Sequence, residues 1–234
     1  MEHKEKKKMR HETKLPKVCN NSEDRINNSE LHNMREKILT ESMKLFLRKG
    51  FRGTSMRDIA DAVNLSKGSL YWHFKSKDDI LNTIIDYHDH IFVDRVIEAV
   101  RKLKGNFIQK LKYSHKWITE FAYNNKVLSI GYSTIAGEMV GSGTEAESKI
   151  MRSYQKYHRF WRELLETGKK EAKIRDNMDI ELVAHVIIAI HQGILLSWYM
   201  NRDIDAPKLS VTYRDLMLLG MIKEERKLKE RSHV

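Results

Sequence analysis

Three serine residues, Ser55, Ser66 and Ser76, each begin a segment with the pattern of a helix start. Asp58 follows the first serine by three positions and Asp79 follows the third by three, which is a typical N-terminal capping pattern. Because successive serines are only eleven and ten positions apart, each intervening helix is limited to about two turns. The spacing predicts two short helices joined by a tight turn, which is the layout of a helix-turn-helix.

A longer helix is expected before this motif, from about Asn33 to Lys49. Asn33 with Glu36 three positions later forms a capping pattern, and Gly50 stands where a glycine commonly ends a helix. Apolar side chains recur between these limits at helical spacing. Residues 33–80 are therefore expected to form a compact helical domain.

The rest of the chain also reads as helical, because 234 residues contain only eleven glycines and two prolines. Strands joined by tight turns usually need more of both residues. We expect an all-α fold with an N-terminal three-helix helix-turn-helix domain and a larger C-terminal helical domain. The expected boundaries are a disordered polar, basic tail at 1–32, the two domains at 33–80 and 81–228, and a C-terminal tail at 229–234. Helices are expected near 77–103, 107–121, 126–139, 145–167, 179–200 and 209–225.

The chain has 43 basic and 32 acidic side chains, a net charge of +11. This excess favours a polyanionic partner, either nucleic acid or a membrane surface. The excess is densest in residues 34–80, with ten basic and six acidic side chains. Residues 182–200 contain no Asp, Glu, Lys or Arg, but they include His185, His191 and Gln192. We expect this segment to be a helix buried on most sides of a protein without a membrane span.

The second short helix carries side chains that suit a nucleic acid duplex. Lys67 can donate to a guanine edge or a phosphate, and Gly68 permits close approach of the backbone. Tyr71, Trp72 and His73 offer donors to phosphate oxygens. The alternative is that the Tyr-Trp pair packs inside the domain, as such pairs on short helices often do.

Residues 50–60 (GFRGTSMRDIA) and 65–77 (LSKGSLYWHFKSK) resemble the TetR/AcrR family of bacterial and archaeal transcriptional regulators. Trp72 stands where the family more often has Tyr. The resemblance implies a dimer that binds a palindromic operator on double-stranded DNA, usually as a repressor that a small-molecule effector releases. It places the DNA contacts at Thr54, Ser55, Lys67, Gly68, Ser69, Tyr71, Trp72, His73 and Lys77.

The resemblance also implies that the C-terminal domain binds the effector and forms the dimer. An apolar or anionic effector, such as an acyl chain or acyl-CoA, is favoured, because few acidic residues lie on these helix faces. The candidate effector-binding residues are Trp117, Phe121, Tyr132, Met139, Tyr157, Trp161, His185 and Ile188. The candidate dimer contacts, within residues 179–225, are Ala189, Gly193, Met217, Leu218, Leu219 and Ile222.

Other classes of protein find less support in the sequence. No nucleophile elbow or Walker loop points to an enzyme, and no cofactor is expected. No metal is expected either, because the spacings of His88 to His90 and of His185 to His191 place each pair poorly for a shared ion. A single cysteine, Cys19, suits a cytoplasmic protein. The open alternatives are a DNA-binding activator and an architectural helix-turn-helix protein without a small-molecule sensor.

Overall fold

A computed structural model describes residues 24–201 and 203–223, with side chains from residue 33 onward. The chain divides into two units between Glu36 and Lys37, within helix α1 (Asp24–Lys49). Helix α1 begins at Asp24, so the predicted start at Asn33 was wrong. Residues 24–32 are polar and lack apolar periodicity, which is why their sequence gave no helical signal. The remainder of the predicted tail and the predicted C-terminal tail lie outside the described residues.

The three serine caps are confirmed. Ser55 precedes α2 (Met56–Val63), Ser66 precedes α3 (Lys67–His73) and Ser76 precedes α4 (Lys77–His88). The turn between α2 and α3 passes through Asn64, which has a φ of 60°, a left-handed conformation that asparagine tolerates. The head, residues 37–80, encloses a small core of Ile59, Val63, Leu70 and Phe74.

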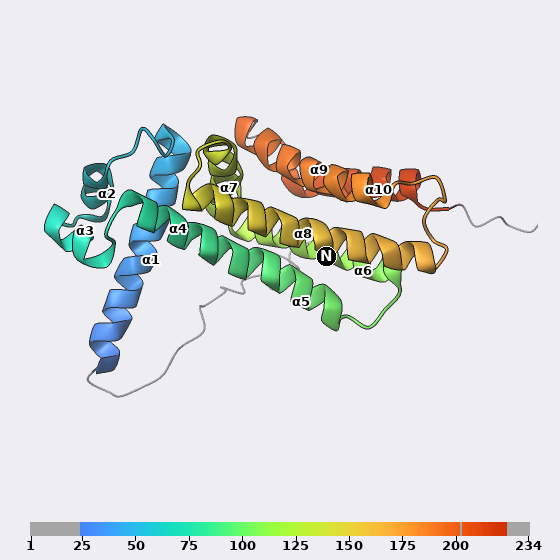
Figure 1. Cartoon of the computed structure of the whole chain (residues 1–234), viewed down its shortest axis with the longest axis horizontal. Helices are drawn as coiled ribbons and strands as arrows, with labels where there is room; N and C mark the ends of the chain where they lie inside the picture. Colours follow the sequence, from blue (N-terminus) through green and yellow to red (C-terminus); the bar gives the residue numbers. More distant parts are fainter. Residues whose placement is uncertain (1–23, 202, 224–234) are drawn as a thin grey trace, which may run out of the picture. The chain divides into compact units, whose positions relative to one another are not determined.

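Helix α4 continues without a break into a π-helical segment, η1 (Asp89–Asp94), and then into α5 (Arg95–Lys102) (Figure 1). The sequence predicted this region as one continuous helix and gave no sign of the wide π turn. The three segments lead from the head into the C-terminal domain. They therefore form a direct helical connection between the two domains.

The C-terminal domain contains five further helices, and the all-α fold class is confirmed for the described residues. These are α6 (Phe107–Asn124), α7 (Lys126–Met139), α8 (Glu145–Lys170), α9 (Ile180–Met200) and α10 (Ala206–Met221). Trp161 and Leu165 of α8 and Phe107 and Leu111 of α6 are fully buried in the main core. An isolated antiparallel bridge between Ile174 and Ile222 joins the loop after α8 to the segment after α10.

Helix α9 is less covered than the sequence analysis expected. By length and composition it could cross a membrane, but only 17% of its most apolar window is buried within the chain. One such helix is weak evidence for a membrane span. Ala184, Ile187, Ile188 and Trp198 face the core, while the opposite side is exposed. A helix that is apolar on most sides favours a second covering surface, and the described residues of the chain supply only the first.

Candidate DNA-binding surface and ligand cavity

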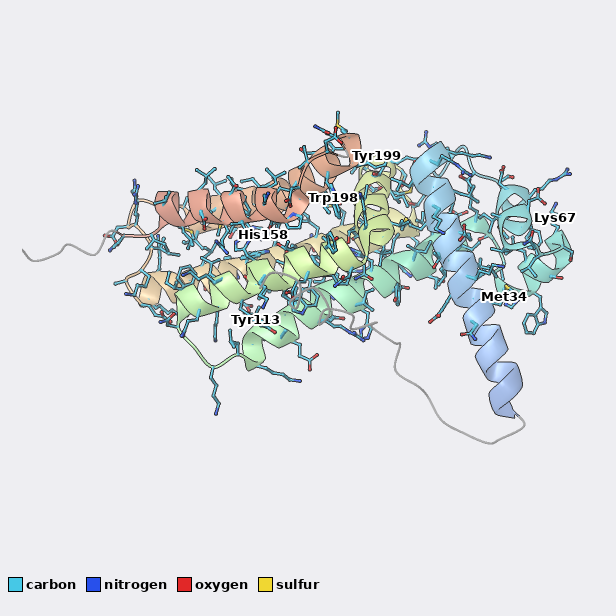
Figure 2. All side chains as sticks on the ribbon, turned by 180° about the vertical axis from the view of Figure 1, so that it is seen from behind. Met34, Lys67, Tyr113, His158, Trp198 and Tyr199 are labelled. Carbon is cyan, nitrogen blue, oxygen red and sulfur yellow. The ribbon has the colours of Figure 1, made fainter. Side chains whose placement is uncertain are left out.

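The exposed side of α3 carries most of the residues that the sequence predicted to contact DNA. Lys67, Gly68 and Ser69 are exposed, and the exposed fractions of Tyr71 and Trp72 are 43% and 70%. Figure 2 shows Lys67 in the head, remote from the helices α8 and α9. Leu70 is the buried residue of this helix, and it holds α3 against α2. The Tyr-Trp pair therefore does not fill the core of the head, which was the alternative interpretation.

Thr54 and Ser55 stabilise the start of α2. Thr54 is 2% exposed, and its hydroxyl donates to the carbonyl oxygen of Gly50 at 2.8 Å. Ser55 and Asp58 form a reciprocal capping box. A hydrogen bond from Lys49, together with those from Ser55, holds the pKa of the Asp58 carboxyl well below its usual range. The hydroxyl of Thr54 is thus turned into the head, whereas Ser55 remains on the surface.

Lys77 has a different environment from the one expected for a phosphate contact. Its Nζ donates to the carbonyl oxygens of Phe51 at 2.6 Å and of Thr54 at 2.7 Å. The same ammonium lies 4.3 Å from the centre of the Phe51 ring, a cation–π contact. The side chain therefore fixes the loop between α1 and α2, an arrangement that its charge alone did not reveal.

Several basic residues that were not predicted to contact DNA are exposed on the head, and three of them lie in or beside α2 and α3. These three are Arg52 in the loop before α2, Arg57 in α2 and Lys75 after α3. The side chain of Arg57 is 86% exposed, and its ion pair with Asp61 is long, at 4.0 Å. Such cations suit phosphate contacts. In the sequence, the only sign that Arg57 is exposed is its position on α2, on the opposite side of the helix from Ile59 and Val63.

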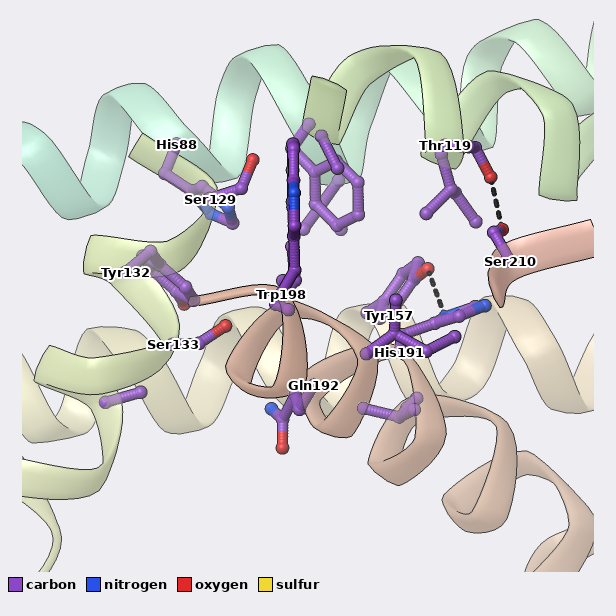
Figure 3. A pocket seen from close by; sticks show the side chains of 18 of the residues that line it. His88, Thr119, Ser129, Tyr132, Ser133, Tyr157, His191, Gln192, Trp198 and Ser210 are labelled. Carbon is purple, nitrogen blue, oxygen red and sulfur yellow. Dashed lines mark hydrogen bonds between the residues drawn. The ribbon is translucent and has the colours of Figure 1, made fainter. Parts of the chain in front are cut away.

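The C-terminal domain contains a cavity bounded by α4, η1, α6, α7, α8, α9 and α10 (Figure 3). Its empty space, including the open mouth, measures about 1030 Å³. Its walls are mainly apolar and aromatic, with Phe92, Tyr132, Tyr157 and Trp198 among them. The lining contains no Asp, Glu, Lys or Arg among the described residues. Ligand sites usually combine such apolar walls with a few polar groups.

The polar groups of the cavity include buried atoms that lack partners among the described residues. These atoms are Nδ1 of His88, Oγ of Ser129 and Nε2 of His191. The ring of His88 stacks on that of Tyr132 with centroids 3.6 Å apart, and burial lowers the pKa of His88 to about 3. His88 is consequently neutral near pH 7. Unpaired buried polar atoms are costly, so each of them favours a ligand group that can complete its hydrogen bonding.

Three of the predicted effector-binding residues line this cavity, namely Tyr132, Tyr157 and Ile188. The other predicted residues do not. Trp117 and Phe121 stack on each other beside Phe92, Trp161 is fully buried in the main core and Met139 is buried at the end of α7. His185 is exposed and pairs with Tyr154. An aromatic stripe at helical spacing thus predicted burial correctly but could not distinguish the cavity wall from the core.

One side chain of α7 joins the cavity domain to the head. The carboxylate of Glu138 accepts the backbone N–H of Phe51 at 2.8 Å and that of Arg52 at 3.0 Å. The loop can approach this closely because Gly50 has a φ of +77°. Earlier turns of α7 supply Ser129, Tyr132, Ser133 and Ala136 to the cavity. A single rigid helix therefore contacts both the ligand cavity and the DNA-binding head.

The predicted dimer contacts lie on α9, on α10 and just beyond α10. Ala189, Gly193 and Leu219 are exposed, whereas Met217, Leu218 and Ile222 are half-buried against the core. A Cβ atom added at Gly193 would meet nothing within 4 Å. Further exposed apolar side chains on these two helices are Leu182, Val186, Leu196, Met200, Val211 and Leu216. We call these six residues, together with the exposed Ala189, Gly193 and Leu219, the α9–α10 apolar surface.

Comparison with known proteins agrees with this arrangement. The family model for bacterial regulatory proteins of the tetR family matches residues 38–84. The HTH-type transcriptional repressor KstR2 of Mycobacterium tuberculosis is 24% identical over 204 residues, which cover 83% of this chain and 96% of that protein. The crystal structure of the MbdR regulator from Azoarcus sp. CIB has a TM-score of 0.74 and 22% identity, and covers 81% of this chain and 100% of that one.

A second similar structure is that of the regulator FadR from Bacillus subtilis in complex with stearoyl-CoA. Its TM-score is 0.65 at 22% identity, with 79% of this chain and 98% of that chain covered. The fold and the exposed recognition helix define a helix-turn-helix DNA-binding regulator with a helical ligand-binding domain. Residues 38–84 match the tetR family of bacterial regulatory proteins, and most of the chain is similar to an HTH-type transcriptional repressor.

Proposed function

We propose that this protein is a dimeric repressor that binds a palindromic operator through α3 and leaves it when an uncharged, largely apolar molecule enters the cavity. The observation that carries the proposal is the double role of α7, which lines the cavity and holds the head loop through Glu138. A ligand that displaces α7 by a small distance also displaces Phe51 and Arg52. The protein acts by binding rather than by catalysis.

The chemistry of the cavity selects the effector. A charged group inside it would lose its hydration without gaining an ionic partner, because no charged side chain lines the wall. The enclosed part of the effector is therefore uncharged, and it offers a hydroxyl, carbonyl or amide to His88 Nδ1 or Ser129 Oγ. An acyl chain fits these walls if its charged head stays outside. A fully enclosed anionic effector does not fit them.

The α9–α10 apolar surface supplies the dimer contact in this proposal. It contains large apolar side chains such as Leu182, Leu216 and Leu219, whose exposed fractions are 61%, 64% and 74%. Contiguous exposed apolar surface of this kind usually marks an interface. A two-fold dimer through these helices would present two α3 helices to half-sites about 34–36 Å apart, one turn of duplex.

The test begins with selection of bound fragments from random DNA, at two salt concentrations, followed by titration of the recovered site. The proposal expects an inverted repeat that survives near-physiological salt. Effector class is then tested with two probes of one carbon skeleton, a long-chain fatty acid and its methyl ester. The ester should release the DNA at a lower concentration than the acid.

Two results would contradict the proposal. Recovery of only sequence-independent, salt-sensitive binding would argue for an architectural protein. Release by the acid at a lower concentration than by the ester would contradict the proposal that the effector is uncharged. A variant that fills the cavity from α6, Ala122→Trp, serves as the control, because it leaves α7 unaltered and should keep the operator affinity while losing the response to both probes.

A further inference from the structure

A cluster of two histidines and one glutamate lies between α8 and α9, outside the cavity. It consists of His158 on α8 with Glu181 and His185 on α9. Each residue offers one ligand atom, and these three atoms lie within 4.8 Å of one another. Figure 2 shows His158 in the region between the two helices. We propose that this cluster binds a divalent transition-metal ion, with Zn²⁺ as the best match.

The positions of the three residues suit a shared ion. Glu181 and His185 are four residues apart on one helix, so their side chains lie on the same face. His158 reaches them from the neighbouring helix, with its Nε2 3.7 Å from Oε1 of Glu181. Donor atoms of a tetrahedral zinc site lie roughly 3.3 Å apart, given bonds of about 2.0–2.1 Å. The two imidazole rings are stacked with centroids 4.0 Å apart, and Nε2 of His158 lies 3.4 Å from the carbonyl oxygen of Glu181, so binding requires rotation of both rings to direct their nitrogens at one ion.

The chemistry of the three ligands fits the same ion. Two imidazoles and one carboxylate form a common ligand set for zinc, which leaves a fourth position for water or another group. Imidazole favours zinc and its neighbours over magnesium or calcium, which prefer oxygen ligands alone. The side chain of His158 is 11% exposed and that of Glu181 is 56% exposed, so an ion can enter from solvent and still be partly shielded.

Tyr154 prepares His185 for metal binding. Its Oη lies 2.7 Å from Nδ1 of His185. When that nitrogen carries the proton and donates it to the tyrosine oxygen, Nε2 of the same ring is left unprotonated and able to bind the ion. Such a partner behind a ligating histidine typically changes metal affinity by about 10–100-fold. Tyr154 also lines the cavity, so an ion here would fix one part of the cavity wall.

The spacings between histidines in the sequence predict no metal site. The pairs His88 with His90 and His185 with His191 are indeed poorly spaced. The one-turn spacing of Glu181 and His185 was overlooked. The third ligand comes from a different helix, which no local spacing could reveal.

The test uses the full-length, untagged protein, stripped of metal and titrated with Zn²⁺ alone. The expected result is one high-affinity ion for each chain, and a Co²⁺-loaded sample with the visible absorption of a tetrahedral site. The double variant His158→Ala/His185→Ala should lose this binding. Tyr154→Phe should weaken it by about 10–100-fold. Circular dichroism would verify that the variants remain helical.

The matched control is His90→Ala, which removes a histidine that pairs with Asp94 away from the cluster. This variant should bind Zn²⁺ as the unmodified protein does. Equal binding by the double variant and the unmodified protein would assign the ion to histidines elsewhere and overturn the proposal. Absence of stoichiometric binding by the unmodified protein would overturn it as well. Neither result depends on DNA binding or on the effector.

Discussion

The carboxylate of Glu138, in the last turn of α7, accepts the backbone N–H of Phe51 at 2.8 Å. The two residues are 87 positions apart in the chain. Phe51 belongs to the loop before α2, and its carbonyl oxygen also accepts a hydrogen bond from Lys77 at the start of α4. The backbone of this loop is thus held from two helices that both reach the ligand cavity.

Replacement of Glu138 by Ala should weaken operator binding. The change removes the acceptor for two backbone N–H groups, and hydrogen bonds to a charged group contribute about 1.5–3 kcal/mol each when they are well shielded. Because Arg52 is exposed, water replaces part of the loss, and we expect roughly a tenfold decrease in affinity. Fluorescence anisotropy with the selected operator would measure it. Glu138→Gln keeps an acceptor oxygen, so its affinity for the operator should lie between those of the unmodified protein and of Glu138→Ala.

Lys67→Ala should reduce the preference for the operator over random DNA by about 1–3 kcal/mol. The side chain is exposed on α3, and its ammonium lies 5.8 Å from the centre of the Tyr71 ring. The melting temperature of the free protein should therefore stay unchanged. Equal losses of affinity on specific and random DNA would assign Lys67 to phosphate contact instead of base recognition.

Lys77→Ala should, by contrast, lower the stability of the free protein. Its ammonium satisfies two carbonyl oxygens of the loop between α1 and α2 and contacts the Phe51 ring. Loss of both hydrogen bonds is expected to cost about 1–3 kcal/mol of unfolding free energy. Denaturant titration measures this value. An unchanged midpoint together with a reduced salt dependence of DNA binding would restore Lys77 as a phosphate contact.

Val186→Glu should convert the proposed dimer into monomers. Val186 is 53% exposed in the middle of the apolar side of α9, and two buried glutamates would face each other or apolar side chains across the contact. Val140→Glu is the matched control, since Val140 is 71% exposed but lies after α7, away from that surface. Sedimentation analysis should find Val186→Glu monomeric and Val140→Glu dimeric. Dimers in both variants would place the interface elsewhere.

Mild acid should destabilise the protein through its buried histidines. Burial lowers the pKa of His88 to about 3 and that of His115 to about 4, from the usual 6.5. At a pH between the lowered pKa values of the folded protein and the usual 6.5, the unfolded chain binds more protons than the folded protein does. The free energy of unfolding is therefore highest above pH 6.5 and decreases as the pH falls below it. Each histidine contributes up to about 1.4 kcal/mol per pH unit. His88→Asn should reduce this slope between pH 6 and pH 5 in denaturant titrations.

The sequence predicted what depends on neighbours along the chain. The serine caps and the glycine after α1 fixed the layout of the head, because capping is decided within four residues. The cavity depends on packing between distant helices. Thus Tyr132 and Trp161 look alike as aromatic residues at helical spacing, yet one lines the cavity and the other is fully buried in the core.

Contacts between distant segments account for the features that the sequence did not reveal. Lys77 was predicted from its charge, but its environment is set by carbonyl oxygens of a loop more than twenty residues earlier. His88 and Ser129 were not selected, because their missing partners become evident only when the surrounding helices are in place. By contrast, the exposure of Ala189 and Gly193 on α9 is compatible with the dimer contacts that the sequence predicts there.

The π segment at 89–94 has a consequence for how length changes are tolerated here. A π turn accommodates one more residue than an α turn, so it absorbs an insertion that would otherwise rotate every later side chain by about 100°. Deletion of one residue from this segment could restore a regular α-helix while His88 and Val96 keep facing the interior. A variant that lacks one residue of the π segment would therefore keep the same orientation at both ends of the helical connection between the head and the C-terminal domain.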